Sequence, residues 1–118
     1  MIANPYSWSN ISNLLFIDSP AGVGLSINED QTYRYTDSNT ADDNLKAVLY
    51  FFEKKFPSYR TKDFFIAGES YAGKYIPDLA LRIHTYNLNA DVKVNLKGIL
   101  IGNGVMDWSD GSLDKNRV

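Results

Sequence analysis

The predicted fold is decided by one stretch, FFIAGESYAG at residues 64–73. Its first four residues are apolar throughout, which is typical of a short strand buried on both faces of a parallel sheet. The remaining six are small or polar and form a turn. The sequence then predicts a helix, because apolar positions recur three and four residues apart, at Ile76, Leu79, Ala80 and Ile83.

Apolar runs at residues 14–17 and 96–101 predict two further buried strands, and Val94 is a candidate to extend the second. The expected order is β-α-β-α-β, and the fold class is α/β with a parallel sheet. Right-handed crossovers place both connecting helices on one face and leave the other face bare. The sequence therefore predicts an incomplete portion of a sheet rather than a closed domain.

The helix between the first two strands is expected to begin near Thr40, with Asp43 completing a capping box, and to end before Pro57. The polar stretch before it, residues 28–39, predicts a loop. Pro77 has no N–H for the carbonyl four residues earlier, so we expect it to end a short first turn of the second helix or to kink that helix.

Composition narrows the classes of function. The chain has 118 residues, room for one domain at most, and 44% hydrophobic residues, enough for a packed core. A net charge of −2, with no basic cluster, argues against a nucleic-acid partner. No cysteine and a single histidine exclude disulfides, thiolate catalysis and zinc fingers, and we expect neither metal nor cofactor. No signal peptide and no membrane span are recognisable.

The junction at residues 64–73 resembles a nucleophile elbow, G-x-S-x-G, in which small residues let a strand reverse into a helix and lift a serine above the sheet. Gly68 fills the first small position and Ala72 the second. Ser70 is the candidate nucleophile, and the backbone N–H of Tyr71 is the candidate oxyanion donor. The alternative is that Ser70 only caps the helix.

A phosphate-binding loop, G-x-x-x-x-G-K-[ST], is a second candidate motif at the same place, because Lys74 follows Gly73. Tyr75 stands where a serine or threonine hydroxyl would bind magnesium, and the carboxylate of Glu69 is a poor neighbour for phosphate. The glycine pairs at residues 22–24 and 102–104 lack the third glycine of a dinucleotide fingerprint and predict turns at strand ends.

A serine nucleophile needs a base, and His84 is the only histidine. It follows Ser70 by fourteen residues, which in a helix corresponds to about 20 Å, whereas a base must come within about 3 Å. His84 is therefore not expected to be the base. In elbows of this kind the chain order is serine, then an acid, then histidine, so the partners would lie downstream.

Four ordered motifs resemble the serine carboxypeptidase family of the α/β-hydrolase fold: residues 4–8 (NPYSW), 15–24 (LFIDSPAGVG), 68–73 (GESYAG) and 102–104 (GNG). The resemblance spans nearly the whole chain, and we expect residues 1–118 to form part of one such domain. It implies that the three strands correspond to the fourth to sixth of a larger sheet. The implied activity is removal of C-terminal residues from peptides and proteins.

The resemblance also assigns the site residues. Ser70 corresponds to the acylated nucleophile and the N–H of Tyr71 to an oxyanion donor. Glu69 corresponds to the acid that binds the terminal carboxylate of the substrate. Two carboxyl groups approach only when one is protonated, so this contact weakens as the pH rises. The Tyr71 ring and Val105 correspond to the pocket for the residue before the scissile bond.

The catalytic acid and base of the family have no counterpart here, so we expect the chain alone to be inactive. Three alternatives stay open: a truncated non-catalytic paralogue that acts as a binding or structural subunit, an acyltransferase of the same fold, and a degenerate phosphate loop. The expected partners are peptide C-termini and whatever covers the exposed sheet edges, the remainder of the domain or another protein. The implied location is the lysosome, the vacuole or the cell exterior.

Overall fold

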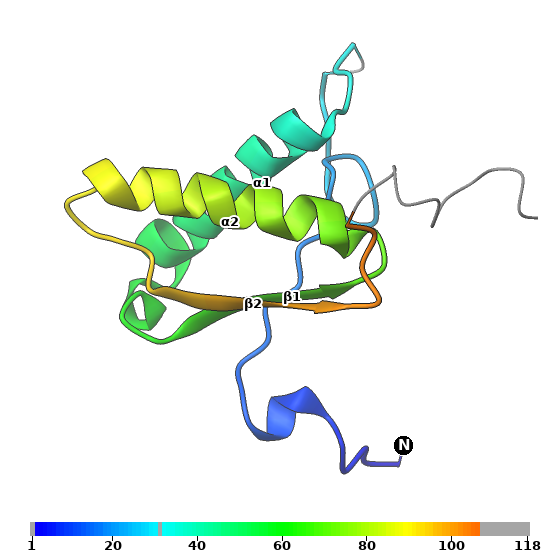
Figure 1. The fold of residues 1–118 in the computed structure, drawn as a ribbon, viewed down its shortest axis with the longest axis vertical. Helices are drawn as coiled ribbons and strands as arrows, with labels where there is room; N and C mark the ends of the chain where they lie inside the picture. The colour runs from blue at the N-terminus through cyan, green and yellow to red at the C-terminus, as the bar shows by residue number, and fades with distance from the viewer. Residues whose placement is uncertain (1, 31, 107–118) are drawn as a thin grey trace, which may run out of the picture.

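The computed structural model describes residues 2–30 and 32–106. The elements in chain order are a 3₁₀ helix η1 (Trp8–Asn10), α1 (Asp37–Tyr50), a π-helix η2 (Phe51–Lys55), a 3₁₀ helix η3 (Pro57–Tyr59), β1 (Phe64–Glu69), α2 (Ala72–Asn89) and β2 (Leu96–Gly102). α1 and α2 both lie on one side of the strands (Figure 1).

β1 and β2 form a parallel pair connected through α2, in a register that places Phe64 opposite Leu96 and Glu69 opposite Gly102. Both strands and α2 confirm the sequence prediction, although Val94 lies just outside β2. Parallel strands end at the same edge of a sheet, so the residues that follow β1 and β2 come together.

The predicted strand at residues 14–17 is wrong. These residues belong to no helix or strand, and their side chains, predicted to be buried, are exposed, Phe16 to 85%. A strand exists only through hydrogen bonds to a neighbouring strand. In the described part of the chain β1 and β2 pair with each other, and residues 14–17 do not join their sheet.

α1 begins earlier than predicted, at Asp37, because the capping box forms around Thr36 instead of Thr40. The Thr36 hydroxyl accepts the N–H of Asn39 at 3.2 Å, and the Asn39 side chain accepts the N–H of Thr36 at 2.8 Å. An asparagine amide therefore does here what was expected of the Asp43 carboxylate. The end of the helical segment before Pro57 is confirmed, with η2 as its last turn.

Of the two effects expected of Pro77, the end of a short first turn is not observed, since α2 runs from Ala72 to Asn89 across it. Proline removes a single N–H, whose acceptor would have been the carbonyl of Gly73, and the rest of the helical hydrogen-bond ladder continues. The loss is confined to one carbonyl in the first turn of the helix.

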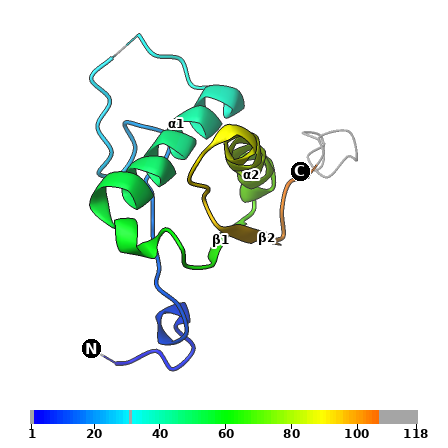
Figure 2. The ribbon, with the colours of Figure 1, turned by 90° about the vertical axis from the view of Figure 1, so that its left-hand side faces the viewer.

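The core lies between the helices and one face of the sheet (Figure 2). Five buried side chains form one cluster: Val48, Phe52, Leu79, Ile83 and Val94. Ala41, Ala72 and Ile76 are buried as well. The opposite face of the sheet is uncovered by any helix of the described residues, and Phe65 is 53% exposed there. The predicted bare face is thus confirmed for this part of the chain.

Candidate functional site

The turn between β1 and α2 consists of two residues, Ser70 and Tyr71. Ser70 has φ +61°, in the left-handed region that residues with a side chain rarely occupy. Strained backbone of this kind clusters at active sites, where the surrounding structure holds it in place. The predicted strand, sharp turn and helix are therefore present, and Ser70 is exposed at the carboxyl end of β1.

Gly68 and Ala72 are small because the turn brings them together. A Cβ on Gly68 would lie 2.6 Å from the Cβ of Ala72 and 2.9 Å from the Cδ1 of Ile76, which is closer than packed atoms allow. Only a glycine before the serine and a small residue after it let the first turn of α2 pack on β1. This close packing is the physical reason why small residues stand two positions before and two positions after Ser70.

Three backbone hydrogen bonds hold Ser70 in place. Its N–H donates to the carbonyl of Gly102 at 3.0 Å, and its own carbonyl accepts the N–H groups of Gly73 at 3.1 Å and Val105 at 2.9 Å. The turn is thereby attached to the segment that follows β2. Val105, predicted to be near the site, is partly buried and hydrogen-bonded directly to it.

These hydrogen bonds bear on two alternatives for this segment: that Ser70 only caps the helix, and that the segment is a phosphate-binding loop. The N-cap position of α2 falls on Tyr71 and has no side-chain capping hydrogen bond, so Ser70 does not occupy it. The N–H groups of Ser70, Gly73 and Lys74 donate to backbone carbonyls. A phosphate loop presents such groups to its ligand, and here they are already used.

Glu69 ends β1 opposite Gly102, and its side chain is exposed beside Ser70 at the same edge of the sheet. A Cβ on Gly102 would lie 3.6 Å from the Cγ of Glu69, so the carboxylate arm lies along the end of β2. This arrangement places a carboxyl group next to the exposed serine.

The Tyr71 ring points toward the start of α1. Its hydroxyl donates to the Asp37 carboxylate at 3.1 Å, and its ring lies 6.2 Å from that of Tyr75. Burial, followed by the hydrogen bond to Asp37, raises the pKa of Tyr71 above its ordinary value. Asp37 was not predicted to lie near Tyr71, because the two are separated by 34 residues and Asp37 falls in a stretch predicted to be a loop.

His84 is on an exposed face of α2 and is not brought to the serine. In a continuous helix its position in the chain corresponds to about 20 Å from Ser70. None of the described residues supplies a histidine base at the turn.

A hollow of about 550 Å³ begins beside the turn, between β1, α1, α2 and residues 15–20. Its lining includes Tyr71, Tyr75 and Asp37, together with Ser19 and Pro20. Ser19 and Pro20 are the first residues of a tight loop. Gly22 and Gly24 in this loop have positive φ, as expected for glycines in a turn.

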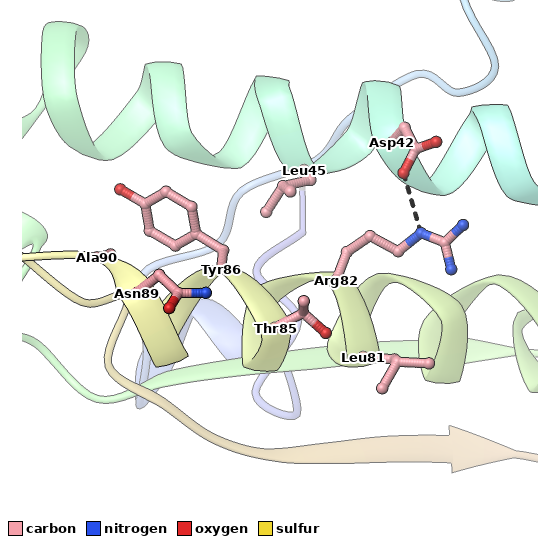
Figure 3. A pocket seen from close by; sticks show the side chains of 8 residues that line it. All are labelled: Asp42, Leu45, Leu81, Arg82, Thr85, Tyr86, Asn89 and Ala90. Carbon is pink, nitrogen blue, oxygen red and sulfur yellow. Dashed lines mark hydrogen bonds and ion pairs between the residues drawn. The ribbon is translucent and has the colours of Figure 1, made fainter.

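A larger groove of about 680 Å³ lies elsewhere, between α1 and the C-terminal half of α2 (Figure 3). Arg82 extends across it toward α1 and is paired with Asp42, at 3.0 Å between Nε and Oδ1. Its charge is therefore already matched, and the other lining side chains offer no activated nucleophile. Chemistry rather than size thus points to the turn at Ser70.

The residues that the structure describes contain no group of three or more histidine, cysteine or acidic side chains able to hold a metal ion. Likewise, within 2–30 and 32–106, no helix has the length and apolar character needed to cross a membrane.

Comparisons with known proteins agree with the motifs. Residues 1–115 match the family model described as serine carboxypeptidase. The chain is 46% identical over 103 residues to venom serine carboxypeptidase of Apis mellifera, covering 86% of this chain and 22% of that protein. It is 43% identical over 112 residues to lysosomal protective protein of Mus musculus, covering 93% of this chain and 22% of that protein.

The structure is similar to that of Kex1(delta)p, a prohormone-processing carboxypeptidase from Saccharomyces cerevisiae, with a TM-score of 0.77 and 28% identity. The match covers 95% of this chain and 27% of the yeast chain. The two-stranded parallel sheet with its helices is thus similar to part of a carboxypeptidase fold, and the chain spans about a quarter of the length of these proteins.

Proposed function

Because this chain belongs to the serine carboxypeptidase family, we propose that it carries the nucleophile of such an enzyme, Ser70, which removes C-terminal residues from peptides through an acyl-enzyme. One observation carries the proposal: Ser70 has a left-handed backbone and an exposed position at the β1–α2 turn. That geometry is costly for a serine and is typical of an activated nucleophile.

In the proposed reaction the Ser70 Oγ forms a bond to the carbonyl carbon of the last peptide bond, while its proton passes to a general base. The C–N bond then breaks, and the departing amino acid takes that proton on its amine. Water hydrolyses the Ser70 ester, which restores the hydroxyl and leaves a new C-terminal carboxylate on the peptide.

Two groups beside Ser70 fit supporting roles in this reaction. The N–H of Tyr71, at the start of α2, would donate to the oxyanion, where the helix N-terminus also favours negative charge. Glu69 would bind the terminal carboxylate of the substrate through one shared proton, which favours binding in acid. Val105, hydrogen-bonded to the Ser70 carbonyl at 2.9 Å, would line the pocket for the residue before the scissile bond.

The general base and the acid that orients it are proposed to lie outside these residues. His84 is too far along α2, and the chain spans only 22% to 25% of three relatives, those from honeybee, mouse and rice. The isolated chain should therefore be catalytically weak, because members of a serine triad act as a unit. The names of two relatives, venom serine carboxypeptidase and lysosomal protective protein, support a lysosomal or secreted location.

A chimera tests the proposal: this chain replaces its aligned segment in the honeybee enzyme, with which it is 46% identical over 103 residues. We expect release of C-terminal amino acids and labelling by a fluorophosphonate probe. Both should disappear in Ser70→Ala and persist in His84→Ala. A folded chimera that neither releases amino acids nor labels would overturn the proposal, and Ser70-dependent activity of the isolated chain would overturn the placement of the base.

A further inference from the structure

Tyr71 is held at its far end by a residue from another element. The phenol donates to both oxygens of the Asp37 carboxylate, at 3.1 Å to Oδ1 and 3.4 Å to Oδ2. Asp37 is the first residue of α1, 34 positions away in the chain. The contact therefore joins the start of α1 to the residue that directly follows the nucleophile.

The Asp37 carboxylate is well placed to act as a fixed anchor. The N-terminus of a helix stabilises a negative charge in its first turn. The start of α1 is itself ordered by the Thr36 capping box, and Ala41, one turn later, is fully buried. A hydrogen bond to a charged acceptor is stronger than one between neutral groups.

The Tyr71 ring is 41% exposed, and the hydrogen bond to Asp37 holds its far end. Its backbone is set by the turn, and the hydrogen bond at the hydroxyl contributes to the direction of the ring. Burial and the hydrogen bond to Asp37 raise the pKa of Tyr71, in the direction that favours the protonated, donating hydroxyl. Asp37 and Tyr71 also line the same hollow beside Ser70.

We infer that Asp37 is a positioning residue for substrate selection: it fixes the Tyr71 ring as one wall of the pocket that takes the side chain before the scissile bond. The inference rests on the proposed function. It assigns Asp37 no contact with the substrate and no part in proton transfer. Removing the anchor should therefore affect substrates according to the size of that side chain.

The test uses the chimera with three blocked dipeptides that carry phenylalanine, leucine or glycine before the scissile bond. In Asp37→Ala we expect kcat/KM to fall roughly tenfold for phenylalanine and leucine and to stay within about twofold for glycine. Asp37→Asn keeps an acceptor without the charge and should be intermediate. Tyr71→Phe keeps the ring without its hydroxyl and should reproduce Asp37→Ala.

A double variant separates this role from general damage. If Asp37 acts through the Tyr71 hydroxyl, Asp37→Ala combined with Tyr71→Phe should be no worse than either alone. Asp78, whose charge also acts on Tyr71, provides the matched control, and Asp78→Asn should keep the substrate preference. Tyr71→Phe leaves the N-terminus of α1 intact, so this variant still tests the inference if Asp37→Ala fails to fold.

Three results would overturn the inference: an equal fall for all three substrates, additive losses in the double variant, or an unchanged preference in both single variants. These outcomes are distinct from failure of the proposed function, which would appear as the absence of Ser70-dependent activity in the unsubstituted chimera.

Discussion

The backbone N–H of Val105 donates a 2.9 Å hydrogen bond to the carbonyl oxygen of Ser70. This bond joins the segment after β2 to the turn after β1, and the N–H of Ser70 returns a bond to Gly102 at 3.0 Å. The strained serine is therefore held from both sides by backbone groups. The geometry of Ser70 depends on how closely the turn after β1 and the segment after β2 approach each other. Glycines allow this close approach because they have no side chain.

Gly73→Ala should separate the two segments. The new Cβ would lie 2.4 Å from the Val105 carbonyl oxygen and 2.7 Å from its nitrogen, and backbone atoms cannot rotate away. We expect a loss of at least about 2 kcal/mol in the free energy of unfolding. Hydrogen exchange at the Val105 amide should become faster. Gly102→Ala, whose Cβ would have its nearest neighbour at 3.6 Å, is the control, and equal exchange in both variants would contradict the prediction.

Gly68→Ala should strain the packing of α2 on β1. The added Cβ would lie 2.6 Å from the Cβ of Ala72, so one of the two elements must shift. Urea unfolding should show a loss of about 1–3 kcal/mol. Gly98→Ala places a Cβ 3.5 Å from the Phe65 ring, an ordinary contact, and should change stability by less than about 1 kcal/mol. Similar losses at both positions would show that the turn has no special requirement for glycine.

The sequence predicted elements whose signal is local. Residues 64–67 are continuously apolar, residues 96–101 are mostly apolar with Lys97 as the one charged residue, and the helix that follows Ser70 has a regular apolar face. The prediction of β1, β2 and α2 therefore needed no knowledge of distant residues. The turn was predictable for the same reason, because the small residues at 68 and 72 are set by contacts within a few positions of the chain.

The features that the sequence did not predict correctly depend on groups that lie far apart in the chain or that are chemically equivalent. Residues 14–17 have the composition of a strand, but a strand also needs a neighbour, which sequence pattern does not supply. The capping box moved four residues because Thr36 with Asn39 has the same spacing as Thr40 with Asp43. The Asp37–Tyr71 hydrogen bond crosses 34 residues and leaves no local pattern.

Adjacent residues on α2 should differ sharply in their effect on stability. Ile83 is fully buried in the core cluster, whereas His84 beside it is exposed. Ile83→Ala should cost about 2–5 kcal/mol in urea unfolding, because it removes buried methyl groups and leaves a cavity. Ile83→Val should cost about 0.5–1.5 kcal/mol, and His84→Ala should stay within about 0.5 kcal/mol. A large loss in His84→Ala would mean that this histidine has a structural role.

Asp43 should make stability depend on acid pH. Its carboxylate accepts hydrogen bonds from the Lys46 ammonium at 2.9 Å and the Tyr33 hydroxyl at 2.7 Å, and these lower the pKa of Asp43 below its ordinary value of 3.8. The folded state thus binds a proton less readily than the unfolded state. The resulting stabilisation is present above pH 3.8 and is lost as the pH falls through the lowered pKa of Asp43. Urea unfolding should therefore show Asp43→Asn less stable than the unsubstituted chain at pH 7, with a difference that shrinks in acid. Tyr33→Phe removes one donor and should keep part of the dependence, and a difference that grows in acid would contradict the assignment.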